Sequence, residues 1–172
     1  MKKINHQILI ERLKKNGWCP VPYKHHPEHI KKAIKAAKFR PAAKQCFLNA
    51  QRLVLMQHEV PLTYVEGIVA NPRINVPFTH AWVKDEEGVC HDVTIGNMYP
   101  VLYCQEYSKE SVWETVLNTE FAYPINEYDL DLRYKAIMLG LDVAAPKEVI
   151  EESLRKRFEY LNSLNEKFNN HG

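Results

Sequence analysis

The chain has 172 residues, of which 45% are hydrophobic, 26% charged and 10% aromatic, and its formal net charge is +2. This composition excludes a disordered, collagen-like or long coiled-coil protein, and a chain of this length can bury one core without a disulfide or a metal ion. No apolar run approaches the ~20 residues that span a membrane, and the first residues do not resemble a signal peptide, so we expect no membrane partner.

The four cysteines, Cys19, Cys46, Cys90 and Cys104, are scattered and form no CxxC pair. Disulfide frameworks use denser and more regular spacings, and such frameworks belong to oxidising compartments. We therefore expect free thiols and a cytoplasmic location.

Charge is distributed unevenly along the chain. Residues 1–44 contain twelve Lys and Arg against two acids, a formal charge of +10, and the remainder carries −8. A basic segment of this kind favours an anionic partner, either a nucleic acid or an acidic protein. The alternative interpretation is that the segment wraps around its own acidic body.

The first third of the chain has helical periodicity. A first helix is predicted over 4–15, where apolar residues recur up to Gly17. A second helix begins at Pro27 and ends before Pro41, with a narrow apolar stripe among lysines. A third runs from Cys46 to Met56 and carries a cysteine in its first turn.

After Met56 the pattern becomes alternating, which is typical of strands. Three strands are predicted, Leu62–Ala70, Phe78–Lys84 and Val89–Ile95, and Val101–Tyr107 adds a fourth. A short helix follows over Ser108–Leu117, and a long helix begins at Pro146. The segment between them, Tyr128–Leu139, fits either a strand or a helix. This order predicts an α+β protein with an antiparallel sheet. We expect a single domain, made of a basic helical segment (1–43), a core (44–107) and a helical cover (108–172).

Cys46 is placed where a cysteine can be reactive. The first turn of a helix presents N–H groups without partners and the positive end of the helix dipole, and both stabilise a thiolate. The alternative is a small buried hydrophobe, which is the ordinary role of a free cysteine. Whether Cys46 is reactive or merely buried depends on which residues lie beside it.

Two polar residues occupy positions that are unusual in strands, His80 in Phe78–Lys84 and Asp92 in Val89–Ile95. If residues 86–88 form a three-residue hairpin loop with Gly88 in the left-handed region, Asp85 pairs with Val89. In this register Trp82 faces Asp92 and His80 faces Thr94, so His80 and Asp92 become diagonal neighbours on one face. A four-residue loop would turn them to opposite faces.

These placements predict a nucleophilic mechanism. His80 takes the proton of Cys46 or stabilises its thiolate, Asp92 orients the imidazole, and the thiolate attacks an amide or ester carbonyl. The backbone N–H of Cys46 would bind the oxyanion, with Gln45 or the indole of Trp18 as the second donor.

Three segments in this order, Lys44–Ala50, Thr79–Val83 and Gly88–Thr94, resemble the core of the transglutaminase-like branch of papain-fold cysteine enzymes. The resemblance implies a nucleophile helix packed on an antiparallel sheet, with Cys46, His80 and Asp92 as a Cys-His-Asp triad. The interval from Cys46 to His80 is short for the large animal transglutaminases. It implies a compact bacterial or viral type, for which hydrolysis, deamidation or peptidase activity is as expected as crosslinking.

Several further residues have both a functional and an ordinary interpretation. Asn49 lines the site or is exposed, Trp82 shields the His–Asp pair or fills the core, and Glu66 contacts substrate or marks a bulge or an edge strand.

Two sets could bind a metal, the cluster Cys19, His25, His26 and His29 and the set Cys90, His80 and Asp92. Neither has the spacing or the fourth ligand of a known site, so no metal is predicted.

The sequence therefore predicts a cysteine enzyme that transfers the acyl group of a protein or peptide amide without a cofactor. The alternative is an inactive scaffold with the same core, whose basic N-terminal segment binds an anionic partner.

Overall fold

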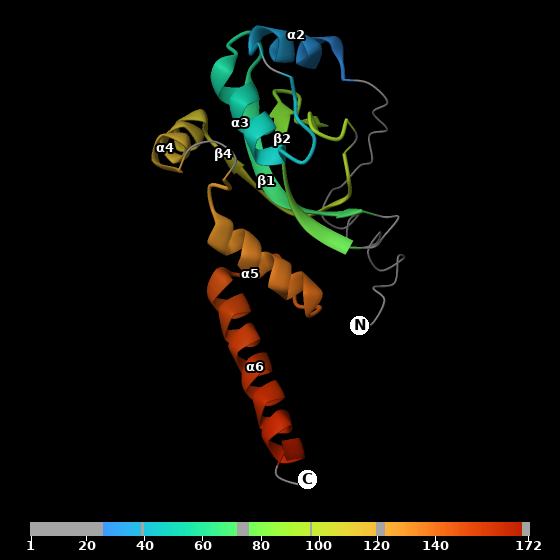
Figure 1. Ribbon diagram of the computed structural model, residues 1–172, viewed down its shortest axis with the longest axis vertical. Coiled ribbons are helices and arrows are strands. Elements are labelled where there is room, and N and C mark those ends of the chain that lie inside the picture. Colours follow the sequence, from blue (N-terminus) through green and yellow to red (C-terminus); the bar gives the residue numbers. More distant parts are fainter. Residues whose placement is uncertain (1–25, 39, 72–75, 97, 120–122, 170–172) are drawn as a thin grey trace. The chain divides into compact units, whose positions relative to one another are not determined.

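The computed structural model describes residues 26–38, 40–71, 76–96, 98–119 and 123–169 (Figure 1). The helix predicted over 4–15 and the candidate residues Trp18, Cys19 and His25 lie outside these ranges. The chain divides into two compact units, residues 1–127 and 128–172, and each is described by itself. The single domain stays a prediction.

The first unit contains a four-stranded antiparallel sheet in the order β3-β2-β1-β4. The strands are β1 (Leu62–Asn71), β2 (Val76–Asp85), β3 (Cys90–His91) and β4 (Val101–Tyr107). β1 pairs with β2 on one side and β4 on the other, so it is a central strand. With the helices described next, this sheet confirms the predicted α+β class.

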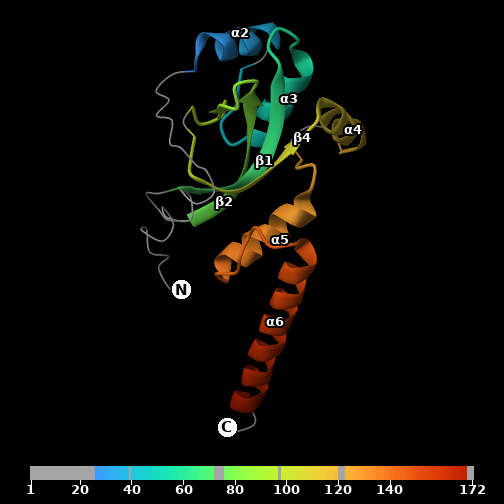
Figure 2. The same cartoon turned by 180° about the vertical axis from the view of Figure 1, so that it is seen from behind.

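Among the described residues of this unit, three helices accompany the sheet: α2 (Glu28–Ala36), α3 (Cys46–Met56) and α4 (Lys109–Thr119). α2 begins directly after Pro27 and α3 at Cys46, as predicted. Figure 1 shows α3 lying along β1 and β2, and Figure 2 shows the same elements from behind. Their apolar side chains form one core with a face of the sheet, which includes Ile30, Ala33, Leu53, Tyr64, Ala81, Val83 and Val112.

The opposite face of the sheet carries a second apolar cluster. Val65, Val69 and Trp82 are fully buried there, with Phe78 and Tyr99 packed against them. Successive side chains of a strand point to opposite faces, which is why Trp82 belongs to this cluster while its neighbours Ala81 and Val83 belong to the other. The two sides of β2 are thus both occupied by packed side chains.

The third strand is shorter than predicted, and the expectation of a strand up to Ile95 is wrong. Pairing ends at His91, and residues 93–95 form a turn. The cause is Asp92, whose Oδ1 accepts the N–H groups of Thr94 (2.8 Å) and Ile95 (2.9 Å). Aspartate side chains that bond the backbone two residues ahead replace strand pairing with a turn.

The second unit is a pair of helices, α5 (Glu127–Met138) and α6 (Lys147–Asn169). The segment that fitted either strand or helix is therefore helical. Leu132 and Ala136 of α5 pack against Ile150 and Leu154 of α6. The predicted apolar face of α6 continues to two exposed residues, Phe158 and Leu161.

Arg133 of α5 stabilises the connection between these helices. Its Nη1 donates to the carbonyl oxygens of Val143 (2.7 Å) and Ala145 (2.5 Å), and its Nε donates to Asp129 (3.3 Å). The bonds to these two carbonyls hold the second half of the loop, before α6, in place.

None of the helices in the described ranges combines the length and the apolar character needed to cross a membrane. Of the four cysteines, Cys46, Cys90 and Cys104 fall in the described part of the chain, and all three are free thiols, as predicted.

Candidate active site

Cys46 is the first residue of α3 and lies behind a sharp backbone turn. Lys44 adopts a left-handed conformation with φ of 64°, which is uncommon for a residue other than glycine. Gln45 then precedes the helix without a side-chain cap, and the first turn contains no acidic residue. The thiol is partly exposed. The positive end of α3 is therefore directed at an accessible sulfur without a competing anion in its own first turn.

His80 and Asp92 form the second part of the site. The Nε2 atom of His80 donates a hydrogen bond of 2.6 Å to Oδ2 of Asp92, and each residue is only 3% exposed. The other carboxylate oxygen is held by the turn at Thr94 and Ile95. Asp92 thus fixes the ring while its own position is fixed by backbone.

The β2–β3 hairpin has the register that brings these residues together. Val83 pairs with His91, Lys84 pairs with Cys90, and the N–H of Asp85 bonds the carbonyl of Val89 at 3.0 Å. Gly88 has φ of 80°, as a three-residue loop requires. This register was predicted and is confirmed. The ladder stops at His91, however, so the predicted strand pairing of Trp82 with Asp92 and of His80 with Thr94 is wrong, and Asp92 reaches His80 from a turn.

The electrostatics of His80 link all three predicted residues. Burial lowers the pKa of His80, but hydrogen bonds to the Asp92 carboxylate and the Cys46 thiol, together with their charges, outweigh burial and raise it to about 9. The imidazole is therefore protonated at neutral pH. His80 is thus hydrogen-bonded to Asp92, and Cys46 lies near enough to affect the charge of the same ring.

Aromatic rings cover this set from one side. Trp82 stacks on His80 with centroids 6.3 Å apart, and Phe78 meets the imidazole edge-on at 5.7 Å. Trp82 is fully buried, so it both shields the His–Asp pair and fills the core. Exclusion of water strengthens the interaction between the two charges.

Asn49 connects the nucleophile helix to the turn that holds Asp92. Its Nδ2 donates to the carbonyl of Ala42 (2.8 Å) and to the hydroxyl of Thr94 (2.9 Å), and its Oδ1 accepts the N–H of Ala42 (3.0 Å). The exposed alternative is wrong, because Asn49 is 1% exposed. It positions the site residues and holds the loop before α3.

Glu66 is fully buried in the central strand β1, so the interpretation as an edge-strand residue is wrong. The interpretation as a bulge is also wrong, because the irregularity in the pairing of β1 with β4 lies between Ile68 and Val69. Oε1 of Glu66 accepts the Tyr64 hydroxyl (2.8 Å) and the N–H of Ile125 (2.6 Å). Burial raises the pKa of the Glu66 carboxyl, although these hydrogen bonds oppose the rise. The residue anchors the segment that follows α4.

Sequence reasoning missed two members of this buried network, Gln51 and Tyr64. Gln51 of α3 donates to the Tyr64 hydroxyl (3.4 Å) and to the carbonyl of Tyr123 (2.6 Å). The available signal was a glutamine on the apolar side of a core helix, since buried polar side chains need hydrogen-bond partners.

The remaining candidates differ in their surroundings. Gln45 is exposed at the helix start. The set Cys90, His80 and Asp92 does not gather as metal ligands. In the described part of the chain, the ligand atoms that lie within 4.8 Å of one another belong to His29, Asp85 and His91.

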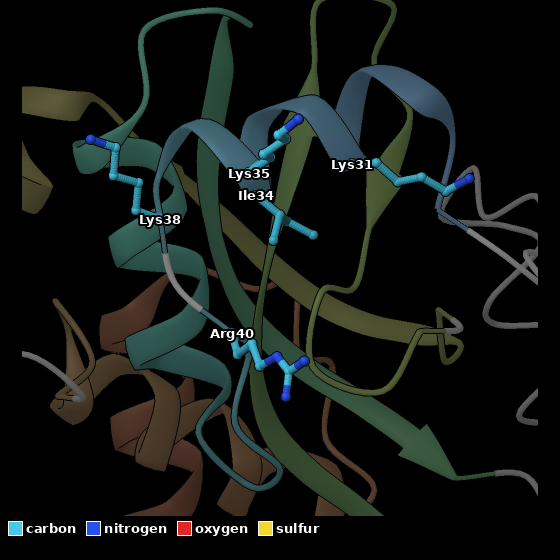
Figure 3. A pocket seen from close by; sticks show the side chains of 5 residues that line it. All are labelled: Lys31, Ile34, Lys35, Lys38 and Arg40. Carbon is cyan, nitrogen blue, oxygen red and sulfur yellow. The ribbon is translucent and has the colours of Figure 1, made fainter.

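A basic hollow of about 410 Å³ lies on α2 and the segment after it (Figure 3). It is lined by Lys31, Ile34, Lys35, Lys38 and Arg40. In Figure 3 Lys31 and Lys35 extend from α2, and Lys38 and Arg40 come from the segment that leads toward α3. Four cationic side chains at one hollow form a surface suited to an anion.

Comparison of the chain with models of known families, with curated proteins and with solved structures found no match.

Proposed function

We propose that the chain is a thiol-dependent acyl-transfer enzyme of a compact transglutaminase-like, papain-fold type that acts on an amide of a protein or peptide. The observation that carries the proposal is the interaction of His80 with both Asp92 and Cys46, where Cys46 is the partly exposed first residue of α3. A partly exposed thiol, a buried imidazole and an orienting carboxylate are the parts that nucleophilic catalysis requires.

The chemistry follows from the resting protonation state. His80 bonds Asp92 through Nε2, which leaves Nδ1 for the sulfur. The protonated ring stabilises a thiolate at Cys46. The thiolate attacks the carbonyl carbon, the C–S bond forms, and the C–N bond breaks as Nδ1 of His80 gives its proton to the leaving amine. The product is a thioester at Cys46 and a neutral imidazole.

The second half of the reaction restores the starting state. Water or an amine attacks the thioester carbon and gives its proton to Nδ1 of His80, the C–S bond breaks, and the thiolate–imidazolium pair forms again. Hydrolysis, deamidation and transamidation share these steps and differ in the amide and the acceptor. The N–H of Cys46 at the start of α3 binds the oxyanion, and Gln45 or Trp18 supplies the second donor.

Selective alkylation tests the nucleophile. We expect iodoacetamide at pH 6 to modify Cys46 at least ~10-fold faster than Cys104, which is exposed and therefore controls for access. His80→Ala should remove the preference, because the sulfur then lacks its imidazolium. Modification is measured by peptide mass spectrometry. Equal labelling of both thiols in the unmodified chain would refute the proposal.

Turnover is tested with peptides that contain glutamine or a scissile anilide, with ammonia or aniline release as the readout. Cys46→Ala should abolish release while leaving Tm within a few degrees, since the side chain is small and partly exposed. Cys104→Ala is the matched control and should retain full activity. Unfolding of Cys46→Ala would show that the cysteine serves packing.

A second candidate function is supported by the basic hollow on α2 (Figure 3). In it the same core is an inactive scaffold, and the basic segment binds an anionic partner. The double variant Lys35→Glu and Arg40→Glu should then abolish salt-dependent binding to an oligonucleotide or to polyglutamate, while Lys156→Glu, outside the hollow, should not. Unselective alkylation of the thiols together with such binding would favour the scaffold over the enzyme.

A further inference from the structure

Three side chains of types that bind metals meet next to the loop of the β2–β3 hairpin. His29 comes from α2, Asp85 from the end of β2, and His91 from β3. The Nε2 atoms of both histidines bond the same oxygen, Oδ2 of Asp85, at 3.2 Å for His29 and 2.7 Å for His91. All three ligand atoms lie within 4.8 Å of one another. Two imidazoles thus converge on one carboxylate oxygen from different elements.

The spacing suits a tetrahedral ion. Zinc binds imidazole nitrogen and carboxylate oxygen at about 2.0–2.2 Å, so neighbouring ligand atoms of a tetrahedral site are about 3.3 Å apart. The His29–Asp85 separation of 3.2 Å already has this value, and the His91–Asp85 pair at 2.7 Å needs to widen by roughly half an ångström. The two histidine Nε2 atoms must also reach this separation from each other, and rotation of the partly exposed His29 side chain can bring them to it.

The carboxylate of Asp85 is held in an orientation that suits metal binding. Oδ1 of Asp85 accepts the N–H groups of Glu87 (3.1 Å) and Val89 (2.8 Å) in the hairpin loop. These bonds direct the other oxygen toward the imidazoles, in the way that outer hydrogen bonds fix metal ligands. His91 is 2% exposed, whereas the side chain of His29 is 43% exposed, so the cluster is closed on one side and open on the other.

We propose that His29, Asp85 and His91 bind a zinc ion, with water in the fourth position. Each histidine then binds the ion through the Nε2 lone pair and keeps its ring proton on Nδ1, so the two hydrogen bonds to Asp85 are replaced by three metal bonds. Imidazole and carboxylate are both established zinc ligands, and a mixed set of this kind is used with an open position. The ligands lie 56 and 6 residues apart, which is why no sequence spacing indicated the site.

The ion would tie α2 to the hairpin. His91 directly precedes Asp92, so a ligand bond at His91 restrains the strand end from which Asp92 contacts His80. The proposal does not depend on catalysis, because the three ligands are separate from Cys46, His80 and Asp92. It assigns the ion a structural role.

The test is zinc binding by the full chain carrying Cys46→Ala, which removes the thiol of the candidate active site as a competing ligand. Competition with a chromophoric chelator should give one zinc per chain, and a hundredfold excess of zinc over Kd should raise Tm by about 5 °C or more. Cobalt in place of zinc should give a tetrahedral spectrum without a sulfur-to-cobalt charge-transfer band, since no thiolate is a ligand.

Ligand variants decide the assignment. His29→Gln and His91→Gln should each weaken zinc binding by roughly 100-fold or more, because even outer hydrogen-bond partners change affinity by 10–100-fold. His58→Gln is the matched control, since His58 is an exposed histidine that contacts Lys109, and it should bind zinc as before. If the buried His91→Gln fails to fold, the half-exposed His29→Gln carries the test. Failure to bind zinc, unchanged affinity in His29→Gln, or a sulfur band with cobalt would each overturn the proposal.

Discussion

The raised pKa of His80 beside Asp92 leads to a prediction about stability, which can be tested without a known substrate. The pKa of His80 is raised from 6.5 to about 9, because the bonds to Asp92 and Cys46 outweigh the effect of burial. Between these two pH values the folded protein keeps a proton that the unfolded chain releases. The stability that His80 contributes is therefore complete below pH 6.5 and is lost as the pH rises through about 9.

The magnitude follows from the size of the shift. One pKa unit corresponds to about 1.4 kcal/mol, so a shift from 6.5 to about 9 corresponds to about 3 kcal/mol between pH 6 and pH 10. In a protein of this size that is a change in Tm of roughly 6–12 °C. Full burial of both side chains means that solvent screens this interaction weakly.

Asp92→Asn isolates the effect. Asparagine keeps an oxygen for the turn at Thr94 and Ile95 but removes the charge beside the ring. Urea unfolding of both proteins at pH 6 and pH 10 should show the variant losing most of the His80 contribution, and the difference between the proteins cancels the titration of other groups. An NMR titration of the His80 ring gives its pKa directly. A ring that titrates at or below 6.5 in the unmodified chain would refute the reasoning.

Three further substitutions test the packing around the site by urea unfolding. Glu66→Ala should lower the free energy of unfolding by about 2–4 kcal/mol, because the Tyr64 hydroxyl and a backbone N–H lose their buried acceptor, whereas Glu66→Gln should cost less. Asn49→Ala should cost about 1–3 kcal/mol and slow the alkylation of Cys46, while the exposed Asn118→Ala should do neither. Gly67→Ala should cost more than about 3 kcal/mol, because its Cβ would lie 2.2 Å from a backbone oxygen and 2.7 Å from the Trp82 ring. A loss below about 1 kcal/mol in Gly67→Ala would contradict the packing described for this face of the sheet.

The parts of the fold that the sequence predicted are those with local signals. α2 follows Pro27, which cannot lie inside a helix, and the hairpin loop contains Gly88, which tolerates the left-handed conformation that the loop needs. Since the side-chain period of a strand is two residues, this loop length alone decided that His80 and Asp92 share a face. The sequence narrowed the hairpin to two registers, and the structure has the one on which the predicted triad depended.

The parts that sequence reasoning missed depend on contacts that are distant along the chain. Glu66 resembled a break in an apolar strand because its acceptor role involves Ile125, which lies 59 residues away. The end of β3 was misplaced for a related reason. Val93 and Ile95 continue an alternating pattern, but the side chain of Asp92 bonds the backbone ahead of it and ends the strand. The pattern favours a strand, and the hydrogen bonds of one aspartate outweigh it.

The geometry of the candidate site is set as much by Asn49 as by the three residues of the triad. Asn49 lies one helical turn after Cys46, and Thr94 lies two residues after Asp92, so their 2.9 Å bond joins the helix of the nucleophile to the turn of the acid. Sliding α3 by one residue would move the sulfur about 1.5 Å along the helix axis and would break this bond. Because thiol chemistry needs the sulfur and the imidazole at hydrogen-bond distance, a displacement of that size would separate them. The pair of Asn49 and Thr94 is thus a requirement of the site, and a chain with Cys46, His80 and Asp92 alone would not be expected to hold them together.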